Sequence, residues 1–278
     1  MDTNGVLIMA EGALRLSTPA PAVLLITLHR PHRRNALDSA LLRDLAAALG
    51  RAAADDGVRC VVITGDDRAF SSGADIHEMR QGGLAVLKDP GRLDSWTAIE
   101  RFPKPLVAAV NGVALGSGNE LALLCDIAIA GETASFGQPE VQLGGMPGDG
   151  GTQRLICAVG KAVAMQMILT GKPIGARAAL AIGLVAEVTP DKRTVARAIE
   201  IALEIAAASP HAVQAAKKAV LQAFELPLAE GLRYERRAMW ALAATPERAA
   251  GLAGFADKPD SASSSRAPTR RRTRRSRT

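Results

Sequence analysis

The sequence has few aromatic residues and few cysteines, and both shortages narrow the possible architectures. Aromatic side chains make up 3% of the 278 residues, so the 48% hydrophobic content is mainly aliphatic. The cysteines number three and the histidines four, and neither set shows the paired spacing of a metal site or a disulfide framework. We therefore expect no structural or catalytic metal, and one large domain with an aliphatic core.

Long apolar runs and an export signal are also missing. No apolar stretch reaches the roughly 18 residues needed to span a bilayer. The N-terminus lacks a charged segment that leads into an apolar one. These absences predict a soluble, cytoplasmic protein without a membrane partner.

Acidic residues are absent from the C-terminus, and this explains the net charge of +6. Residues 261–278 carry seven arginines, so the other 260 residues hold 27 basic and 28 acidic side chains. The segment 259–278 has almost nothing apolar to bury and is predicted to be disordered. Two interpretations of this tail stay open: a passive solvated extension, or a contact for acidic partners such as nucleic acid.

Short apolar stretches alternate with amphipathic ones in the first half of the chain. Strands are predicted at 22–29, 58–64, 105–110 and 127–130, and helices at 38–54 and 91–101. After about residue 150 the chain is rich in Ala and Leu and predicts further helices, the first at 161–170, with one late strand within 183–188. This alternation is typical of an α/β fold, in which helices pack beside a mostly parallel sheet.

Three segments carry the groups that acid–base chemistry requires. Glu120 ends the glycine-rich segment 112–120, and Glu140 ends Phe-Gly-Gln-Pro-Glu at 136–140. A third segment, 69–76, places small residues directly after a predicted strand. Two carboxylates can move protons, and free backbone N–H groups can hold an oxyanion. The combination favours an enzyme that acts on a carbonyl compound.

Taken one at a time, these segments also have structural explanations. Ser117 falls in the first turn of a predicted helix, where unpaired N–H groups favour negative charge. If Ser72 contributes its backbone N–H, that group can donate to the carbonyl oxygen of a ligand. Equally, both loops can be packing turns, with Asp75 as a helix cap and Glu140 as a surface carboxylate.

Together, the segments resemble one family, the enoyl-CoA hydratase/isomerase family or crotonase superfamily. The order and spacing hold from about residue 22 to 256. The matching segments are 30–37 (Arg-Pro-His-Arg-Arg-Asn-Ala-Leu), 70–76, 112–120, 136–140 and 147–155 (Pro-Gly-Asp-Gly-Gly-Thr-Gln-Arg-Leu).

The resemblance implies a fold and an assembly. Residues 1–190 would form a crotonase-like spiral of ββα units that contains the active site. Residues 191–258 would form a C-terminal helical region that caps the site and builds a trimer, often paired into a hexamer.

The resemblance also implies how a coenzyme A thioester is held. The backbone N–H groups of Ser72 and Ser117 would form the oxyanion hole. Residues Ser72, Gly73, Ala74, Asp75 and Ser117 would line the path of the thioester. Because coenzyme A is part of the substrate, no separate cofactor is expected.

The reaction implied is addition of water to a trans-2-enoyl-CoA, giving a 3-hydroxyacyl-CoA. Glu120 would orient and deprotonate water for attack at C3, Glu140 would deliver a proton to C2, and Gly148 would help to hold the water. Hydratases of the family carry both glutamates, whereas isomerases commonly keep one. The alternatives are Δ3-Δ2 isomerisation or other enolate chemistry on a specialised acyl-CoA, and a nucleic-acid-binding protein that acts through its tail.

Two residues depart from the family pattern. Ser117 stands where relatives usually have glycine, and its hydroxyl is expected to narrow the pocket. Asp149 stands where relatives often have alanine, and a third acid there is expected to shift the titration of the two glutamates.

Overall fold

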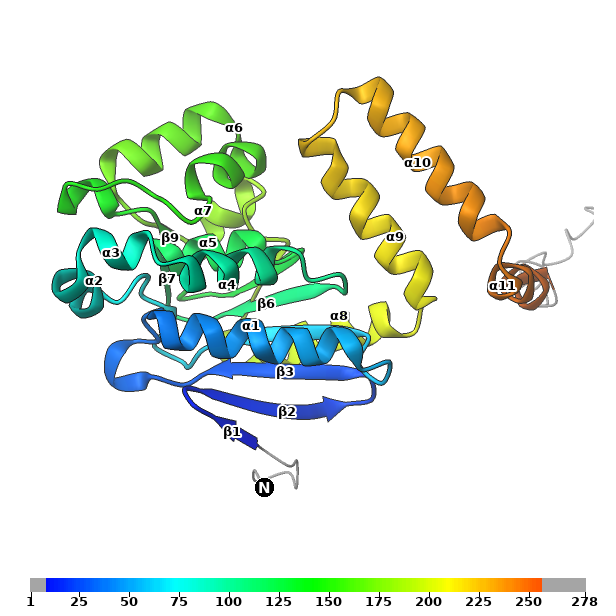
Figure 1. Ribbon diagram of the computed structural model, residues 1–278, viewed down its shortest axis with the longest axis horizontal. Coiled ribbons are helices and arrows are strands. Elements are labelled where there is room, and N and C mark those ends of the chain that lie inside the picture. The colour runs from blue at the N-terminus through cyan, green and yellow to red at the C-terminus, as the bar shows by residue number, and fades with distance from the viewer. Residues whose placement is uncertain (1–8, 257–278) are drawn as a thin grey trace, which may run out of the picture.

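Aliphatic runs that are buried at every residue form two central strands in the larger of two sheets in the computed structural model, which describes residues 9–256 (Figure 1). Its strand order is β1-β2-β3-β4-β6-β8-β11. The strands are β1 (Met9–Glu11), β2 (Leu14–Ala20), β3 (Val23–Leu28), β4 (Cys60–Thr64), β6 (Leu106–Val110), β8 (Ile127–Gly131) and β11 (Glu187–Thr189). From β3 to β11 neighbouring strands are parallel, so the α/β class is confirmed.

Helices cover both faces of this sheet. Helix α1 (Ser39–Ala54) begins after the predicted cap Asp38, whose side chain accepts a hydrogen bond from the N–H of Leu41 at 2.8 Å. It packs with α4 (Pro90–Glu100). Helix α8 (Thr194–Ala206) buries Ala198 and Ala202 in a cluster with residues of β3, β4 and β8. Because α8 belongs to the core, the helical region that stands apart begins later than the predicted boundary at residue 190.

A second, smaller sheet has the order β10-β9-β7-β5. Its strands are β5 (Ala69–Ser71), β7 (Val113–Leu115), β9 (Ser135–Gly137) and β10 (Ile174–Gly175). Strands β5, β7 and β9 are parallel neighbours. None of them was predicted, because two or three residues are too short for an alternating pattern to be recognised.

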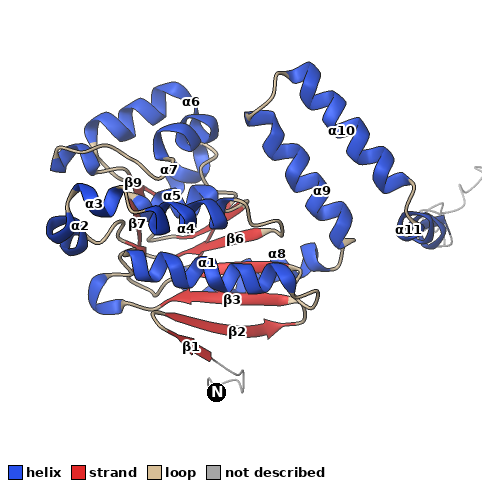
Figure 2. Cartoon of the chain, viewed as in Figure 1, coloured by secondary structure: helices blue, strands red, loops and turns tan. Residues whose placement is uncertain are grey.

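The remaining helices are shown in Figure 2. They are α2 (Ile76–Gly82), α3 (Leu84–Leu87), α5 (Ser117–Leu124), α6 (Gly151–Thr170), α7 (Ala176–Ala181), α9 (Pro210–Leu221), α10 (Leu228–Ala243) and α11 (Pro246–Ala256), of which α9, α10 and α11 stand apart from the sheets. Four short 3-10 helices are η1 (Pro31–Arg33), η2 (Glu140–Leu143), η3 (Asp191–Arg193) and η4 (Gln222–Phe224). Helix α6 consists of two helical segments that meet at Gly160, whose φ of 76° and ψ of 165° are not helical, and the second segment is the helix predicted at 161–170.

Helices α9 and α10 pack on each other and extend away from the sheets in Figure 1. No residue of either helix is buried. Lys217 of α9 contacts the core, with Nζ 2.8 Å from Asp126 Oδ2 and 2.9 Å from the carbonyl oxygen of Lys104. In the part of the chain that the structure describes, no helix is long and apolar enough to cross a membrane. The predicted tail at 259–278 lies outside the described residues.

Candidate active site

The three parallel strands of the small sheet each lead into one of the three chemistry-bearing segments. Strand β5 leads into residues 72–75, β7 into Gly116 and Ser117, and β9 into residues 138–140. Because the carboxyl ends of parallel neighbours lie at one edge of a sheet, the three segments converge there. The predicted glutamates and glycine-rich loops are therefore brought together by strands that the sequence pattern did not reveal.

The loop after β5 contains Ser72, the predicted oxyanion donor. The N–H of Ser72 donates to the carbonyl oxygen of Arg34 at 2.9 Å, so it is not free for a ligand. The N–H of Asp75 is also engaged, with the carbonyl oxygen of Leu37 at 3.1 Å. Between them, the N–H of Ala74 has no acceptor among residues 9–256. In this structure the N–H of the predicted donor Ser72 is engaged by Arg34, whereas the N–H of Ala74 is free, and the role of Ser72 as oxyanion donor stays a prediction.

Gly73 lets this loop approach the end of β7. Its φ is +103°, and a Cβ atom built there would lie 2.7 Å from the carbonyl oxygen of Leu115 and 3.5 Å from the backbone nitrogen of Ser117. A larger residue would push the two loops apart. The close approach places the segment that carries the N–H of Ala74 beside Ser117.

Asp75 supports the loop and has little surface left for a ligand. Its carboxylate accepts hydrogen bonds from the N–H groups of His77 and Glu78, at 3.0 and 3.3 Å, and from Arg30 Nη2 at 2.9 Å. Burial alone would raise the pKa of Asp75, but these hydrogen bonds lower it overall. The carboxylate is a helix cap, as the structural alternative predicted, and it is 4% exposed. The place of Asp75 along the path of the thioester stays a prediction.

Ser117 is the first residue of α5 and has a free backbone N–H. No described residue accepts from this N–H, which lies at the positive end of the helix dipole. The hydroxyl donates to Asp149 Oδ2 at 2.7 Å. The Ser117 backbone is thus suited to hold an oxyanion, while its hydroxyl is already engaged by Asp149.

Glu120 lies one turn further along α5 and is 1% exposed. Its Oε1 accepts hydrogen bonds from the N–H groups of Asp149 and Gly151, at 2.9 and 2.6 Å. Gly151 can come this close because a Cβ atom there would lie 2.9 Å from Oε1. Burial raises the pKa of Glu120 to about 7, and the charges of Asp149 and Glu140 add to the rise, against the two N–H donors.

Glu140 begins η2 after β9 and is partly buried. Burial raises its pKa, and Asp149 contributes in the same direction. With the Gln138 amide oriented to satisfy its neighbours, its nitrogen donates to Glu140 Oε1 at 3.0 Å and its oxygen accepts from Asn119 Nδ2 at 3.3 Å. Since Asn119 precedes Glu120 in α5, this amide chain links the Glu140 carboxylate to the helix that carries Glu120. Neither amide was singled out in the sequence.

Asp149 connects the site to α4 through Arg92. Arg92 Nη2 lies 3.0 Å from Asp149 Oδ2, and the arginine is 2% exposed. Arg92 was not predicted from the sequence to belong to the site. A signal was present, because Arg92 shares the buried face of α4 with Trp96 and Ile99 at helical spacing, where a charged side chain needs a partner.

Gly148 is exposed, and the space around its Cα is open. The N–H groups that contact Glu120 belong to its neighbours Asp149 and Gly151. The role of Gly148 in holding water stays a prediction. Within residues 9–256, no group of three or more His, Cys, Asp or Glu side chains is arranged to hold a metal ion.

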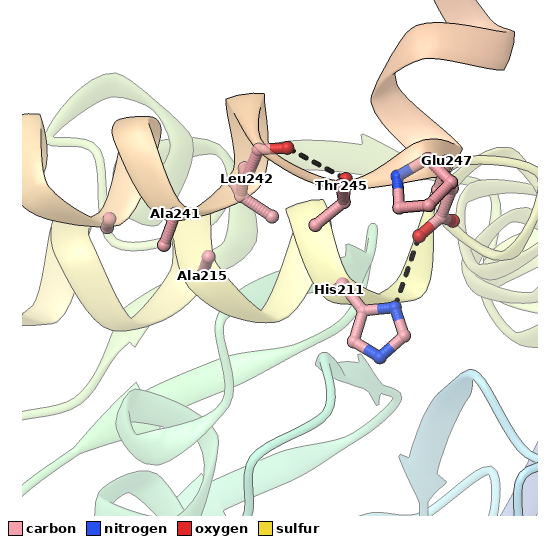
Figure 3. Close-up of a pocket in the computed structure, with 8 residues that line it drawn as sticks. His211, Ala215, Ala241, Leu242, Thr245 and Glu247 are labelled. Atoms are coloured by element: carbon pink, nitrogen blue, oxygen red, sulfur yellow. Dashed lines mark hydrogen bonds and ion pairs between the residues drawn. The ribbon is translucent and has the colours of Figure 1, made fainter.

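A separate groove lies between α9, α10 and α11 (Figure 3). Its volume is about 660 Å³, and it is lined by His211, Ala215, Ala238, Ala241, Leu242, Thr245, Pro246 and Glu247. Two polar contacts join residues of the groove: His211 Nδ1 is 3.2 Å from Glu247 Oε2, and the Thr245 hydroxyl donates to the carbonyl oxygen of Leu242 at 2.7 Å (Figure 3). None of the three chemistry-bearing segments contributes to this groove.

Comparison with known proteins agrees with this geometry. A family model described as enoyl-CoA hydratase/isomerase matches residues 19–264. The chain is 49% identical over 236 residues to the 2,3-dehydroadipyl-CoA hydratase of Escherichia coli (strain K12), covering 85% of this chain and 92% of that protein. It is 43% identical to the mitochondrial enoyl-CoA hydratase of Pongo abelii, covering 84% of this chain and 81% of that protein.

A solved structure of enoyl-CoA hydratase from Bacillus anthracis superposes on the chain with a TM-score of 0.82 at 36% identity. The match covers 88% of this chain and 96% of that one. The crotonase-like fold expected from the sequence motifs is confirmed by this agreement.

Proposed function

The chain belongs to the enoyl-CoA hydratase/isomerase family, and we propose that Glu120 and Glu140 add water across the double bond of a trans-2-enoyl-CoA bound to the N–H groups of Ala74 and Ser117. The observation that carries this proposal is the convergence of two carboxylates with raised pKa and two free N–H groups at one edge of the small sheet. Hydration needs both kinds of group, because water must be deprotonated while negative charge develops on the thioester oxygen.

The two N–H groups act on the thioester carbonyl. Attack at C3 moves electron density toward that oxygen, and donors fixed before the reaction stabilise the charge as it develops. One such donor contributes roughly 3–4 kcal/mol to transition-state stabilisation in other acyl-transfer enzymes. The helix dipole of α5 acts in the same direction at Ser117.

The glutamates divide the proton transfers. We assign water deprotonation to Glu120, because a carboxylate whose pKa is raised to about 7 is a stronger base near neutral pH, and two N–H groups hold its Oε1 in place. Glu140 then donates the proton that C2 receives, and the roles reverse in dehydration. Since the two carboxylates interact, the active form carries one proton on the pair, and the pH dependence of the reaction belongs to the pair.

Further properties belong to the same proposal. The enzyme uses no cofactor besides the coenzyme A of its substrate, and it acts in the cytoplasm. It assembles as a homotrimer or as a hexamer of two trimers. The apolar side chains of the C-terminal helices, including Phe224, Leu228 and Trp240 at 62%, 78% and 61% exposed, would then be covered by neighbouring copies.

The reaction catalysed is tested by product analysis. Purified protein is incubated separately with crotonyl-CoA, with 2,3-dehydroadipyl-CoA and with a trans-3-enoyl-CoA, and the products are separated by chromatography. We expect 3-hydroxyacyl-CoA from at least one of the two 2-enoyl substrates. Conversion of the 3-enoyl substrate to its 2-enoyl isomer, with no hydrated product from either 2-enoyl substrate, would show an isomerase instead.

A further inference from the structure

Asp149 makes contacts with three separate elements around the glutamates. Its Oδ2 accepts hydrogen bonds from the Ser117 hydroxyl at 2.7 Å and from Arg92 Nη2 at 3.0 Å. Its N–H donates to Glu120 Oε1 at 2.9 Å, and its carbonyl oxygen accepts from Arg154 Nη1 at 3.1 Å. One residue thus joins α4, the start of α5 and the start of α6.

The guanidinium of Arg92 is buried and relies on this contact for a counter-charge. Arg92 is 2% exposed, and its Nη1 has no hydrogen-bond partner in the described part of the chain. Asp149 is the acidic group with which Arg92 forms an ion pair. A buried guanidinium is strongly destabilising when its single partner is removed. The contacts with Arg92 and with the Ser117 hydroxyl therefore hold the Asp149 carboxylate in a fixed position.

We propose that Asp149 is a positioning residue for the glutamate pair, which acts by fixing Ser117 and Glu120 of α5 to Arg92 of α4. The inference rests on the proposed function and deepens it. The backbone N–H groups of Asp149 and Gly151 set the direction of the Glu120 carboxylate, while the Asp149 side chain fixes the first turn of α5. The orientation of the Ser117 N–H and of the Glu120 carboxylate then depends on one ion pair.

The same arrangement has an electrostatic consequence. The charges that act on Glu120 are those of Asp149 and of Glu140 in η2. Asp149 in turn contacts Arg92 of α4 and Arg154 of α6, and Arg154 pairs with Glu100 of α4 at 2.7 Å. The negative charge of Asp149 favours the protonated form of Glu120, and it does the same for Glu140. The charge of Asp149 therefore raises the pH at which the glutamate pair loses its shared proton. The opposite charge of Arg92 is expected to lower that pH.

The test compares kcat and kcat/KM for crotonyl-CoA across pH 5–10 in the wild type, D149N, R92M and the double variant R92M/D149N. D94N, which removes an exposed carboxylate from α4, is the matched control for loss of one negative charge. In D149N we expect the alkaline limb of kcat/KM to move down by roughly one pH unit, because a neighbouring negative charge is lost and Arg92 is left unpaired. In the double variant the shift should be smaller, since both charges are gone.

The positioning role has a second readout in S117A, which keeps the backbone N–H but loses the hydrogen bond to Asp149. We expect kcat to fall by roughly tenfold or more with little change in KM and no shift of the alkaline limb. Should D149N unfold, R92M/D149N supplies the comparison, because it leaves no buried unpaired charge. A folded D149N or double variant with the wild-type pH profile, together with wild-type kcat in S117A, would overturn the proposal.

Failure of the proposed function gives a different result. If the wild type hydrates no 2-enoyl-CoA, the titration of Glu120 is followed instead through unfolding. The difference in unfolding free energy between each background and its E120Q variant is measured from pH 5 to 9. The proposal predicts that the step in this difference occurs at lower pH in the D149N background, and an unchanged step would contradict it.

Discussion

At the scale of single residues, the chemistry depends on which backbone N–H groups are left without an acceptor. Arg34 and Leu37 accept from the N–H groups of Ser72 and Asp75, so that Ala74 between them stays free. Glu120, in contrast, is surrounded by donors and by other acids, and burial raises its pKa. Two predictions follow from these two environments.

The first concerns the backbone donor. Replacing Ala74 by lactic acid, through incorporation of the hydroxy acid, exchanges the N–H for an ester oxygen and leaves the side chain unchanged. We expect kcat for crotonyl-CoA to fall roughly 10²–10³-fold, because one oxyanion donor is removed. The equivalent ester at Ser72 serves as control, since it removes the bond to Arg34 and is expected to lower Tm more than kcat. The opposite pattern would support Ser72 as the donor.

The second concerns the pH dependence of stability. Folding raises the pKa of Glu120 from its ordinary 4.5 to about 7, so the folded state binds this proton more tightly than the unfolded state. The associated stability is fully present below pH 4.5 and is lost as the pH rises through 7. Relative to E120Q, which does not titrate, the wild type should lose about 3 kcal/mol of unfolding free energy across this range. Denaturant unfolding at pH 4.5, 6 and 8 measures the difference, and a constant difference would contradict the assignment.

At the scale of elements, three-residue strands hold the site together. Strand β5 pairs with β7, β7 with β9, and α5 packs directly over β5. The contact is close at Gly118, where a Cβ atom would lie 2.4 Å from the carbonyl oxygen of Ser71. The distance between the free N–H groups of Ala74 and Ser117 therefore depends on the packing of one helix on one short strand.

Substitution G118A tests this dependence. The added methyl group pushes α5 away from β5, and we expect about 1–3 kcal/mol of destabilisation together with at least a tenfold loss of kcat. Substitution G50A, on an exposed position of α1 with nothing within 4 Å, is the matched control and should add about 0.5–1 kcal/mol of stability at unchanged kcat. Thermal unfolding and crotonyl-CoA kinetics give both values. Wild-type kcat in G118A would mean that the donors do not depend on this contact.

At the scale of the whole molecule, the C-terminal hairpin of α9 and α10 stands outside the core and carries large exposed apolar side chains. We expect light scattering to give three or six times the chain mass of 28.9 kDa. Substitution of Leu228 and Trp240 by Asp should reduce the mass to that of one chain, because charges would be buried between copies. K218D, a charge change at an exposed position of α9, should leave the assembly intact. A monomeric wild type would contradict the proposed trimer.

The longer elements and both glutamates could be predicted from the sequence for identifiable reasons. Asp38 is a good N-cap before a run of leucines, and the glycines before Glu120 mark a turn in which a ligand can approach the backbone. The position of the free N–H could not be predicted, because it depends on residues that are distant in the sequence. The carbonyl oxygens of Arg34 and Leu37 accept from the N–H groups on either side of Ala74 and leave that of Ala74 free.

The ion pair between Arg92 and Asp149 was missed for a related reason. The two residues are 57 positions apart, and their contact depends on how α4 packs beside the start of α6. Sequence periodicity reports which face of a helix is buried, but it does not report what that face meets. The same limit applies to the small sheet, whose pairing joins segments of two or three residues that carry no pattern.

The central claim is that two carboxylates act together on one double bond. The most direct measurement is steady-state hydration of crotonyl-CoA by the wild type, E120Q and E140Q, with E132Q, at an exposed glutamate, as the matched control. We expect kcat to fall by at least 10²-fold in E120Q and in E140Q, since each loses a general acid or base, and to be unchanged in E132Q. Near wild-type hydration by either E120Q or E140Q would contradict the two-glutamate mechanism.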